Sequence, residues 1–571
     1  MGSTGDDYYD LGSFHRGVTT RNPTAQKWFD RGLVWCYGFN HEEAARCFES
    51  VIENDPDCSM GYWGLAYALG PNYNKPWELF DEKDLETSLR RVHDAVHKAQ
   101  EHAAKATPFE QAVAHAIQFR NPKDVADKDY SRYNRAYADA MEAVYRQFPD
   151  DLDAVTLYAD ALMNLTPWEL WDLRTGKPMP GSRAVEVKTV LDRALADHEQ
   201  QAHEHPGLLH MYIHMIEMSH TPELGITLAD RLRDLIPDAG HLRHMPSHLD
   251  ILIGDYRRAI ASNAAAAEAD EKYYAREGGM NFYTLYRLHD YHSLVYAAMF
   301  NGQSRAALDT VAKMEEHLPA SLLSVDSPPM ADWLESFLSA RLHVLVRFGR
   351  WHDILALPLP ADPHLYCVTT AMTHYAKGIA YAVTADIPRA SEQRALLRAA
   401  VSRVPDTRME YPNRASDILA IAVAMLDGEL EYRKENYDDA FAHLRKAVEL
   451  DDSLNYAEPW AWMQPTRHAL AALLLEQGRV QEAADAYAAD LGFDDTLPRA
   501  RQHPNNVWAL HGYHECLARL GGRDHEQTRK IVEQQLRLAL AVADVEVTAS
   551  CYCRRGRGEG EGSTKASCGG C

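Results

Sequence analysis

The sequence predicts an all-α fold in which helix–turn–helix units repeat to form a solenoid. Apolar residues recur at the helical spacing through most of the chain, and no long stretch alternates between apolar and polar residues as a strand would. Two histidine pairs provide a second observation. His210 and His244 are thirty-four residues apart, and so are His214 and His248. A fixed interval of this length is typical of repeats made of paired helices.

The length, charge and termini narrow the class of protein. A chain of 571 residues can form several domains or one long solenoid, which has no single core to limit its size. The net charge of −24 argues against nucleic-acid binding, because phosphate repels an acidic surface. No apolar stretch is long enough to cross a bilayer, and the first residues lack the basic start and apolar core of a secretory signal. We therefore expect a cytoplasmic protein without a nucleic-acid or membrane partner.

We expect a polar segment over residues 1–23, a solenoid over 24–545 wound as a right-handed superhelix, and a tail over 546–571. The first repeat is the clearest. Its large, small, aromatic and helix-ending positions are occupied by Trp28, Gly32, Ala44, Phe48 and Pro56. The small residues allow paired helices to approach closely, and the proline ends the second helix because it cannot continue the hydrogen-bond ladder.

Three loops are expected to interrupt the repeats, at residues 71–76, 166–183 and 455–467. Long loops on a solenoid commonly lie on one face and border a site, although the second loop could equally cap the groove. The tail is rich in glycine, serine and arginine and nearly free of apolar residues, so we expect it to be flexible. Its four cysteines could bind a soft metal such as zinc or cuprous copper, or they could be incidental.

The repeat positions named above resemble the tetratricopeptide-repeat (TPR) superfamily over most of residues 24–522. A narrower likeness to a large bacterial and fungal TPR-like family is carried by six motifs. They are F-N-H-E-E-A (39–44), A-L-G-P-N-Y-N (68–74), H-P-G-L-L-H-M-Y-I-H (205–214), H-L-R-H-M-P-S-H (241–248), Y-A-E-P-W (456–460) and H-P-N-N-V-W (503–508). The resemblance implies the fold and implies no particular activity.

The resemblance also implies which side chains face the concave groove of the superhelix. The groove positions of the first helices are occupied by His210, His214, Glu217, His244, His248, His289 and His292. Ordinary TPR scaffolds present lysine and asparagine at two of these positions, where they hold a partner's C-terminal carboxylate. Histidine at those positions departs from that pattern, so the usual peptide clamp is not expected here.

The histidine cluster predicts a metal site. We expect His210, His214, His244 and His248 to converge on one divalent ion, with Glu217 and His292 as the next candidate ligands. Neighbouring helix axes lie about 8–10 Å apart, a gap that two inward-pointing imidazoles can span. Imidazole binds iron, copper and zinc, so we expect one of these transition metals. The alternative is a polar groove that binds no metal.

Two functions remain open. The first is a metal-dependent enzyme, an oxidoreductase or a hydrolase, that acts on a small organic substrate in the groove. The second is a scaffold without catalysis that binds a protein segment, with the histidines forming hydrogen bonds or sensing pH. Known nucleotide-binding, serine-hydrolase and zinc-protease motifs are absent from the sequence. The candidate substrate-binding residues are aromatic or imidazole side chains: Tyr283, Tyr286, His289, Trp460 and Trp462.

Overall fold

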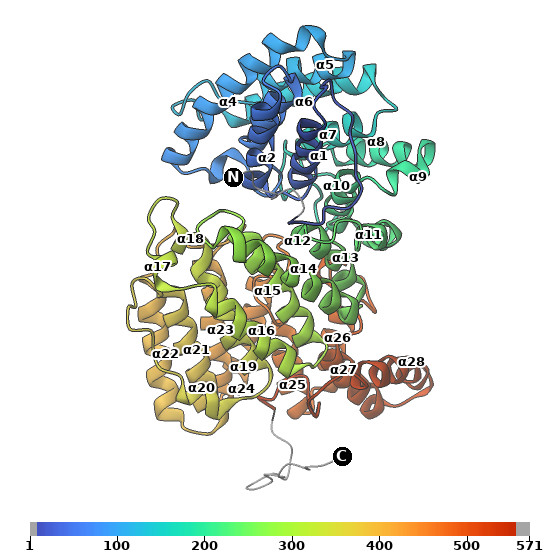
Figure 1. Cartoon of the computed structure of the whole chain (residues 1–571). Coiled ribbons are helices and arrows are strands. Elements are labelled where there is room, and N and C mark those ends of the chain that lie inside the picture. Colours follow the sequence, from blue (N-terminus) through green and yellow to red (C-terminus); the bar gives the residue numbers. More distant parts are fainter. Residues whose placement is uncertain (1–7, 555–571) are drawn as a thin grey trace, which may run out of the picture.

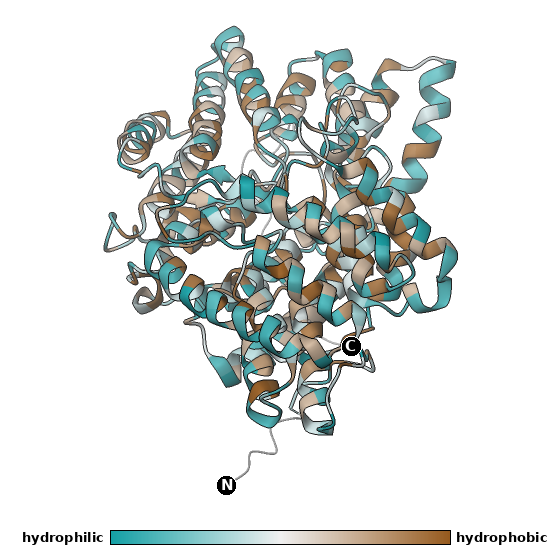
Figure 2. Cartoon of the chain, turned by 90° about the horizontal axis from the view of Figure 1, so that it is seen from above, coloured by the Kyte–Doolittle hydropathy of each residue, from teal (hydrophilic) through white to brown (hydrophobic). Residues whose placement is uncertain are grey.

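The computed structural model describes residues 8–554, and within that range the predicted all-α, TPR-like class is confirmed (Figure 1). The only strands there form a small hairpin, β1 (Met409–Glu410) and β2 (Asn413–Arg414), paired antiparallel. No helix in the described part of the chain is long and apolar enough to cross a membrane. Most helices carry both hydrophilic and hydrophobic residues (Figure 2), as expected for elements with one buried face.

The N-terminal third begins with the predicted first repeat. Helix α1 starts at Pro23, where the side chain of Asn22 accepts hydrogen bonds from the next backbone amides. Gly32 lies against the ring of Phe48, and a Cβ atom at Gly32 would come within 2.8 Å of that ring. The small residue therefore lets the two helices approach, as the pattern predicted. The helices of this third are α1 (Pro23–Tyr37), α2 (His41–Asn54), α3 (Ser59–Ala68), η2 (Trp77–Leu79), α4 (Glu82–His102), η3 (Ala103–Lys105), α5 (Pro108–Ala116), η4 (Ile117–Phe119), α6 (Tyr130–Gln147), α7 (Leu152–Met163), α8 (Ala184–Asp197) and α9 (Glu199–Ala202).

The middle third contains the histidine-rich helices. Pro246 has no backbone N–H and separates α12 from α13, but Met245 keeps helical dihedral angles (φ −48°, ψ −40°). The chain therefore continues in a helical path, and residues four apart across the break remain neighbours. The helices are α10 (Pro206–Glu217), η5 (Pro222–Gly225), α11 (Ile226–Leu232), α12 (Gly240–His244), α13 (Pro246–Ile253), α14 (Tyr256–Glu277), α15 (Thr284–Phe300), α16 (Ser304–Glu316), α17 (Ala320–Leu323), α18 (Met330–Leu334), η6 (Glu335–Ser339), α19 (Ala340–Arg347) and α20 (Trp351–Ala356).

The C-terminal third is the most regular part of the solenoid. Consecutive helices pack as pairs, and α21 also contacts α23, as α25 contacts α27, so that first helices stack on one another. This is the arrangement expected of a helical-repeat solenoid. The helices are α21 (Cys367–Val383), α22 (Ile387–Val401), α23 (Ala415–Arg433), α24 (Tyr437–Ser453), α25 (Thr466–Glu476), α26 (Val480–Leu491), η7 (Arg499–Arg501), α27 (Val507–Leu520) and α28 (Arg523–Leu540).

The solenoid closes on itself, because its C-terminal third packs against its middle third (Figure 1). The indole of Trp508 donates a hydrogen bond to the carbonyl of Met299 (2.7 Å), and the backbone amide of Ser304 donates one to Asp544 (2.7 Å). The hydroxyl of Tyr256 also donates to a backbone carbonyl in the loop before α27. The interior is therefore enclosed by elements from distant parts of the sequence.

The three predicted loops are all found between helices, and two of them meet. The indole of Trp168, in the second loop, donates to the carbonyl of Tyr73 in the first (3.2 Å). The ring of Trp168 also lies 5.6 Å from that of Tyr411, in the hairpin. The third loop ends at Pro465, because α25 begins at Thr466. Residues of all three loops line one pocket: Asn74 from the first, Trp168 from the second and Glu458 from the third.

The tail differs from its expectation over residues 546–554. Ser550 is buried, its hydroxyl donates to the carbonyl of His468 (2.9 Å), and its own carbonyl accepts from Arg347 (2.8 Å). Cys551 and Cys553 are joined by a disulfide. The backbone here is ordered by donors on the repeats, which composition alone does not reveal. Residues 555–571, with the other two tail cysteines, lie outside the described part of the chain.

Candidate metal centre

Helix α10 runs through the middle of the molecule, with every residue buried. It begins at Pro206, where the Nδ1 atom of His205 accepts the backbone N–H of Leu208 (3.1 Å). Gly207 lies against the ring of Tyr37, and a Cβ atom at Gly207 would come within 2.5 Å of that ring. This close approach brings α10 against α1 and directs the α10 histidines into the interior.

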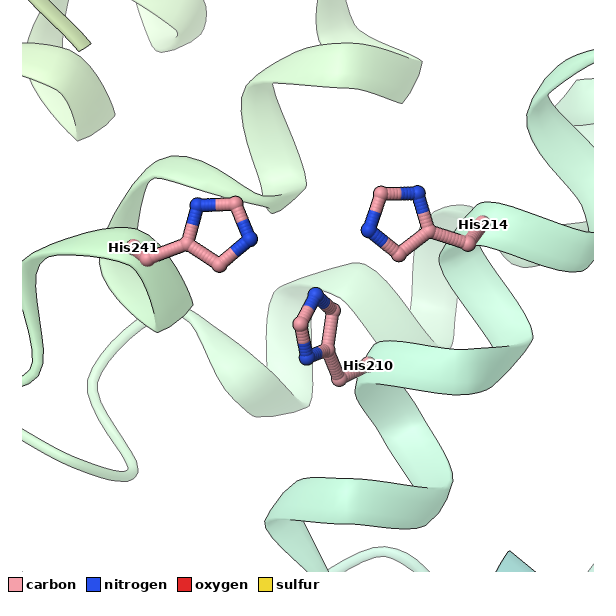
Figure 3. Close-up of side chains that lie close together, drawn as sticks. All are labelled: His210, His214 and His241. Atoms are coloured by element: carbon pink, nitrogen blue, oxygen red, sulfur yellow. The ribbon is translucent and has the colours of Figure 1, made fainter. Parts of the chain in front are cut away.

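Six histidines gather at this point. They are His210 and His214 on α10, His241 and His244 on α12, His248 on α13, and His289 on α15. The ring centroids of contacting pairs are 4.5 Å (His244 and His289) to 6.4 Å (His214 and His241) apart. Figure 3 shows three of the rings, two from one helix and one from the helix opposite, facing a shared space.

The six side chains divide into two groups of three. In each group, one potential ligand atom per residue lies within 4.8 Å of those of the other two. The inner triad consists of His210, His214 and His241, all buried; the pocket triad consists of His244, His248 and His289, of which the last is half-buried. Two further sets with the same spacing join the triads: His214, Glu217 and His248, and His241, His244 and Asp290.

Hydrogen bonds fix the orientation of two rings in the inner triad. The Nδ1 atom of His210 lies 2.5 Å from the carbonyl oxygen of Tyr37, which can only accept, so this nitrogen carries the hydrogen. The Nδ1 atom of His214 lies 2.8 Å from Oε1 of Glu217. Both Nε2 atoms are buried and have no hydrogen-bond partner among the described residues. Nε2 of His210 therefore presents a free lone pair to the shared space, and Nε2 of His214 does so when its Nδ1 donates to an ionised Glu217.

The pocket triad has the same arrangement with one added feature. Nδ1 of His244 lies 2.5 Å from Oδ1 of Asn263, whose amide donates to the carbonyl of Ala259 (2.9 Å) and is thereby oriented. Nδ1 of His248 lies 2.5 Å from Oε2 of Glu217. The Nε2 atoms of His244 and His248 lie 2.7 Å apart. Because Nδ1 of His244 donates to Asn263, its Nε2 carries a lone pair, which can accept a hydrogen from Nε2 of His248 or, once that hydrogen is displaced, bind a metal ion together with His248.

The six imidazoles bind protons weakly. Burial lowers the pKa of His214 to about 3 and, despite its hydrogen bond to Asn263, that of His244 to about 4. Burial, with repulsion from neighbouring imidazoles, lowers the pKa values of His210, His241, His248 and His289 well below the usual range. The rings are therefore neutral near pH 7, which is the form of imidazole that binds metals.

Buried carboxyl groups surround the histidines. Burial raises the pKa of Glu217 well above its usual range, and burial together with the neighbouring Glu217 does the same for Glu458. Burial and the neighbouring Asp270 raise the pKa of Asp290. Such groups ionise readily only beside positive charge, and bound metal ions can supply it. A carboxylate that accepts from the second nitrogen of a ligating histidine is a common feature of metal sites.

The structure brings together the four histidines that the thirty-four-residue interval singled out. Glu217 lies with them and contacts His214 and His248 through their Nδ1 atoms. His292 lies outside both triads, with its Nε2 atom 3.1 Å from the sulfur of Met463. The reason is the 22-residue helix α14, which lengthens the interval from His244 to His292 to forty-eight residues and breaks the register.

Two members of the triads were not among the ligands expected from the sequence. His241 lies three residues before His244, a spacing that places both on one face of a helix and could have identified it. His289, which was expected to bind substrate, also completes the pocket triad. Asn263 lies on α14, which packs on α12 and α13, and Glu458 lies in the third loop. Glu458 falls within the motif Y-A-E-P-W (456–460), but that motif does not mark it as a neighbour of the histidines.

A pocket of about 80 Å³ opens beside the pocket triad. His289, His292, Glu410 and Glu458 line it together with the aromatic side chains of Trp168, Tyr286, Trp333, Phe337 and Tyr411. Two of the expected substrate-binding residues, Tyr286 and His289, are thus at this pocket. Tyr283 is buried and donates to Asp270 (3.0 Å).

Trp460 and Trp462, which were also expected to bind substrate, do not line this pocket. Trp460 packs against Tyr456, at 5.2 Å between ring centroids. Trp462 packs against His343, at 4.7 Å.

No protein-family model matches the sequence, and no curated protein matches it. Solved structures give distant similarities. The Cut9–Hcn1 hetero-tetramer of the APC/C is 13% identical, with 90% of this chain and 76% of that chain covered and a TM-score of 0.31. Yeast Tom70 is 11% identical, with coverages of 91% and 89% and a TM-score of 0.25. TM-scores this low carry no argument, so the fold assignment rests on the helix pairs described above.

Proposed function

We propose that this protein is a metal-dependent enzyme that acts on a small organic substrate at the edge of the histidine cluster. The observation that carries the proposal is the pair of buried, unpartnered Nε2 atoms of His210 and His214, whose Nδ1 atoms are held by acceptors. A buried polar atom without a partner is costly, by about 1–3 kcal/mol. A bound metal ion removes that cost at both atoms.

The ligand chemistry favours a redox-active metal. All six triad members offer neutral nitrogen donors, which suit copper and iron as well as zinc. An oxidoreductase is therefore the preferred reaction class. A hydrolase would use zinc in the same donor set, and the identity of the bound metal separates the two classes.

The pocket supports a substrate that is small and largely apolar. Its aromatic walls can stack against a planar group, and it reaches the histidines through His289. Burial raises the pKa of Glu410, also in this pocket, to about 8, so its carboxyl is protonated at neutral pH and can donate a hydrogen bond to the substrate.

Metal content measured by mass spectrometry tests the proposal. We expect purified wild-type protein to carry a transition metal in at least stoichiometric amount, and the double variant His214→Ala/His248→Ala to carry only traces. His343→Gln is the matched control, because His343 is also buried with an unpartnered nitrogen but lies outside both triads. Circular dichroism checks that each variant is folded. If the folded wild type and the folded double variant carry equal trace amounts of metal, the protein has no metal site at these histidines.

The alternative, a scaffold that binds a protein segment, would then apply. The triads give it little support, because five of the six imidazoles are buried and a partner could reach only His289. A scaffold would therefore have to use another face of the solenoid.

A further inference from the structure

The number and grouping of the histidines raise the question of how many ions they hold. An ion bound by histidine nitrogens has ligand distances near 2.0–2.1 Å and commonly takes three or four such ligands. Of the potential ligand sets among the described residues, none combines His210 with a member of the pocket triad. One ion therefore cannot collect all six imidazoles, whereas each triad is complete for an ion of its own.

Each triad is also oriented by its own hydrogen bonds. The carbonyl of Tyr37 holds a ligand of the inner triad, and Asn263 holds a ligand of the pocket triad. Glu217 serves both, since Oε1 accepts from His214 and Oε2 accepts from His248. One carboxylate thus orients one ligand in each triad, an arrangement that a single-ion site does not need.

The charges nearby allow two ions. The six imidazoles are neutral ligands, and the buried carboxyls of Glu217 and Asp290 and the half-buried carboxyl of Glu458 lie beside them. With all three carboxyls ionised, two monovalent ions leave a net charge of −1 and two divalent ions a net charge of +1, so either pair comes close to balance. Copper is among the metals that imidazole ligands suit.

The triads are close enough for their ions to interact. The rings of His214 and His248 are 5.7 Å apart, as are those of His241 and His244, and each pair spans the two triads. Two-metal sites in enzymes commonly hold their ions about 3.5–4 Å apart.

Resting on the proposed function, we propose that the inner and pocket triads bind one copper ion each and form a dinuclear centre. The pocket-triad ion, reached through His289, is the one that meets substrate. The inner-triad ion is shielded from the pocket by the protein and influences the substrate only through the pocket-triad ion. His292, although it lines the same pocket, is not a ligand.

Copper titration tests the proposal. Full-length protein is stripped with a chelator and titrated anaerobically with cuprous ions, and bound copper is measured by mass spectrometry. We expect about two copper ions per chain for wild type and for the control His292→Gln, and about one for His241→Gln and for His289→Gln. Electron paramagnetic resonance of the cupric form gives a second readout. A coupled pair in wild type gives little signal, and each one-copper variant gives about one spin per chain.

The outcomes separate the two proposals. One copper per chain in wild type, with a full cupric signal, would overturn the dinuclear centre and leave the metal-dependent enzyme standing. No bound metal of any kind would overturn both. Two zinc ions but no copper would overturn the assignment to copper. If a triad variant does not fold, the wild-type stoichiometry still decides between one ion and two.

Discussion

The protein buries histidines in two regions, and they differ in how the second ring nitrogen is used. In the C-terminal third, the Asp490 network consists of Asp490, His468, His503, Asn506 and Arg347. Nε2 of His468 donates to Asp490 (2.7 Å), and Nδ1 of the same ring accepts from Arg347 (3.1 Å). Both nitrogens of His468 are thus partnered within the protein, whereas in the inner triad Nε2 of His210 and of His214 has no partner among the described residues.

This difference separates a structural histidine from a candidate ligand. Burial is similar in both regions, since His468 and His210 are each at most 1% exposed. In the Asp490 network the hydrogen bonds and charge interactions with His468 and His503 hold the pKa of Asp490 far below its usual range despite its burial. At the metal centre burial raises the pKa values of Glu217 and Glu458. Burial alone is therefore not evidence of a metal site.

The largest expected effect comes from breaking the Asp490 network. Asp490→Asn removes the charge that pairs with His468 and His503, and we expect it to lower the free energy of unfolding by about 3–5 kcal/mol at pH 7. Metal content should not change. The control is Asp485→Asn, on the same helix but exposed. Urea unfolding with metal analysis measures both quantities.

The pH dependence sharpens this prediction. The folded-state pKa of Asp490 is lowered, so its contribution is fully present above the unfolded pKa, near 4, and is lost as the pH falls below it. The difference between wild type and Asp490→Asn should therefore shrink in acid. A loss of metal without a loss of stability would contradict the distinction between the two regions.

The next effect is on metal affinity. Glu217→Gln keeps one side-chain oxygen, which can accept a hydrogen bond from one histidine, and replaces the other oxygen with an NH2 group, which cannot accept. Either His214 or His248 therefore loses its orienting partner. We expect metal affinity to fall about 10–100-fold, with little change in unfolding. Glu223→Gln, at an exposed ion pair with Arg499, is the control. Competition with a chromophoric chelator measures the affinity, and an unchanged value would show that Glu217 does not orient the ligands.

The smallest expected effect concerns Glu410. Its contribution to stability is lost as the pH rises, whereas that of Asp490 is lost as the pH falls. Burial raises the folded-state pKa of Glu410 to about 8, so its contribution to stability is present below the unfolded pKa, near 4.5, and is lost as the pH rises through about 8. Glu410→Gln does not titrate. We expect it to gain about 1 kcal/mol relative to wild type between pH 5 and pH 9, since the side chain keeps partial exposure. Thermal unfolding at both pH values measures this, and a difference that does not vary with pH would contradict it.

The sequence predicts the fold well because the repeat pattern is local. Gly32 and Phe48 can be identified as partners from their spacing alone, and the structure places them in contact. The thirty-four-residue interval between His210 and His244 likewise predicts that four histidines lie close together, because neighbouring repeats stack in register.

Register fails where the chain inserts extra residues. The long helix α14 shifts α15, so that His289 rather than His292 joins the cluster. Asn263, near one end of the cluster, and Glu458, in a distant loop, reach it only through tertiary packing. No periodicity in the sequence encodes those contacts.

The closure of the solenoid has a consequence for biosynthesis. Ordinary helical-repeat arrays gain stability unit by unit, and their N-terminal repeats can fold while the rest of the chain is still being made. Here Glu458 and Met463, which border the histidines, belong to the last quarter of the chain, and Trp508 joins that quarter to α15. Metal loading into the finished site therefore requires that the last quarter of the chain has been made and has packed against α15.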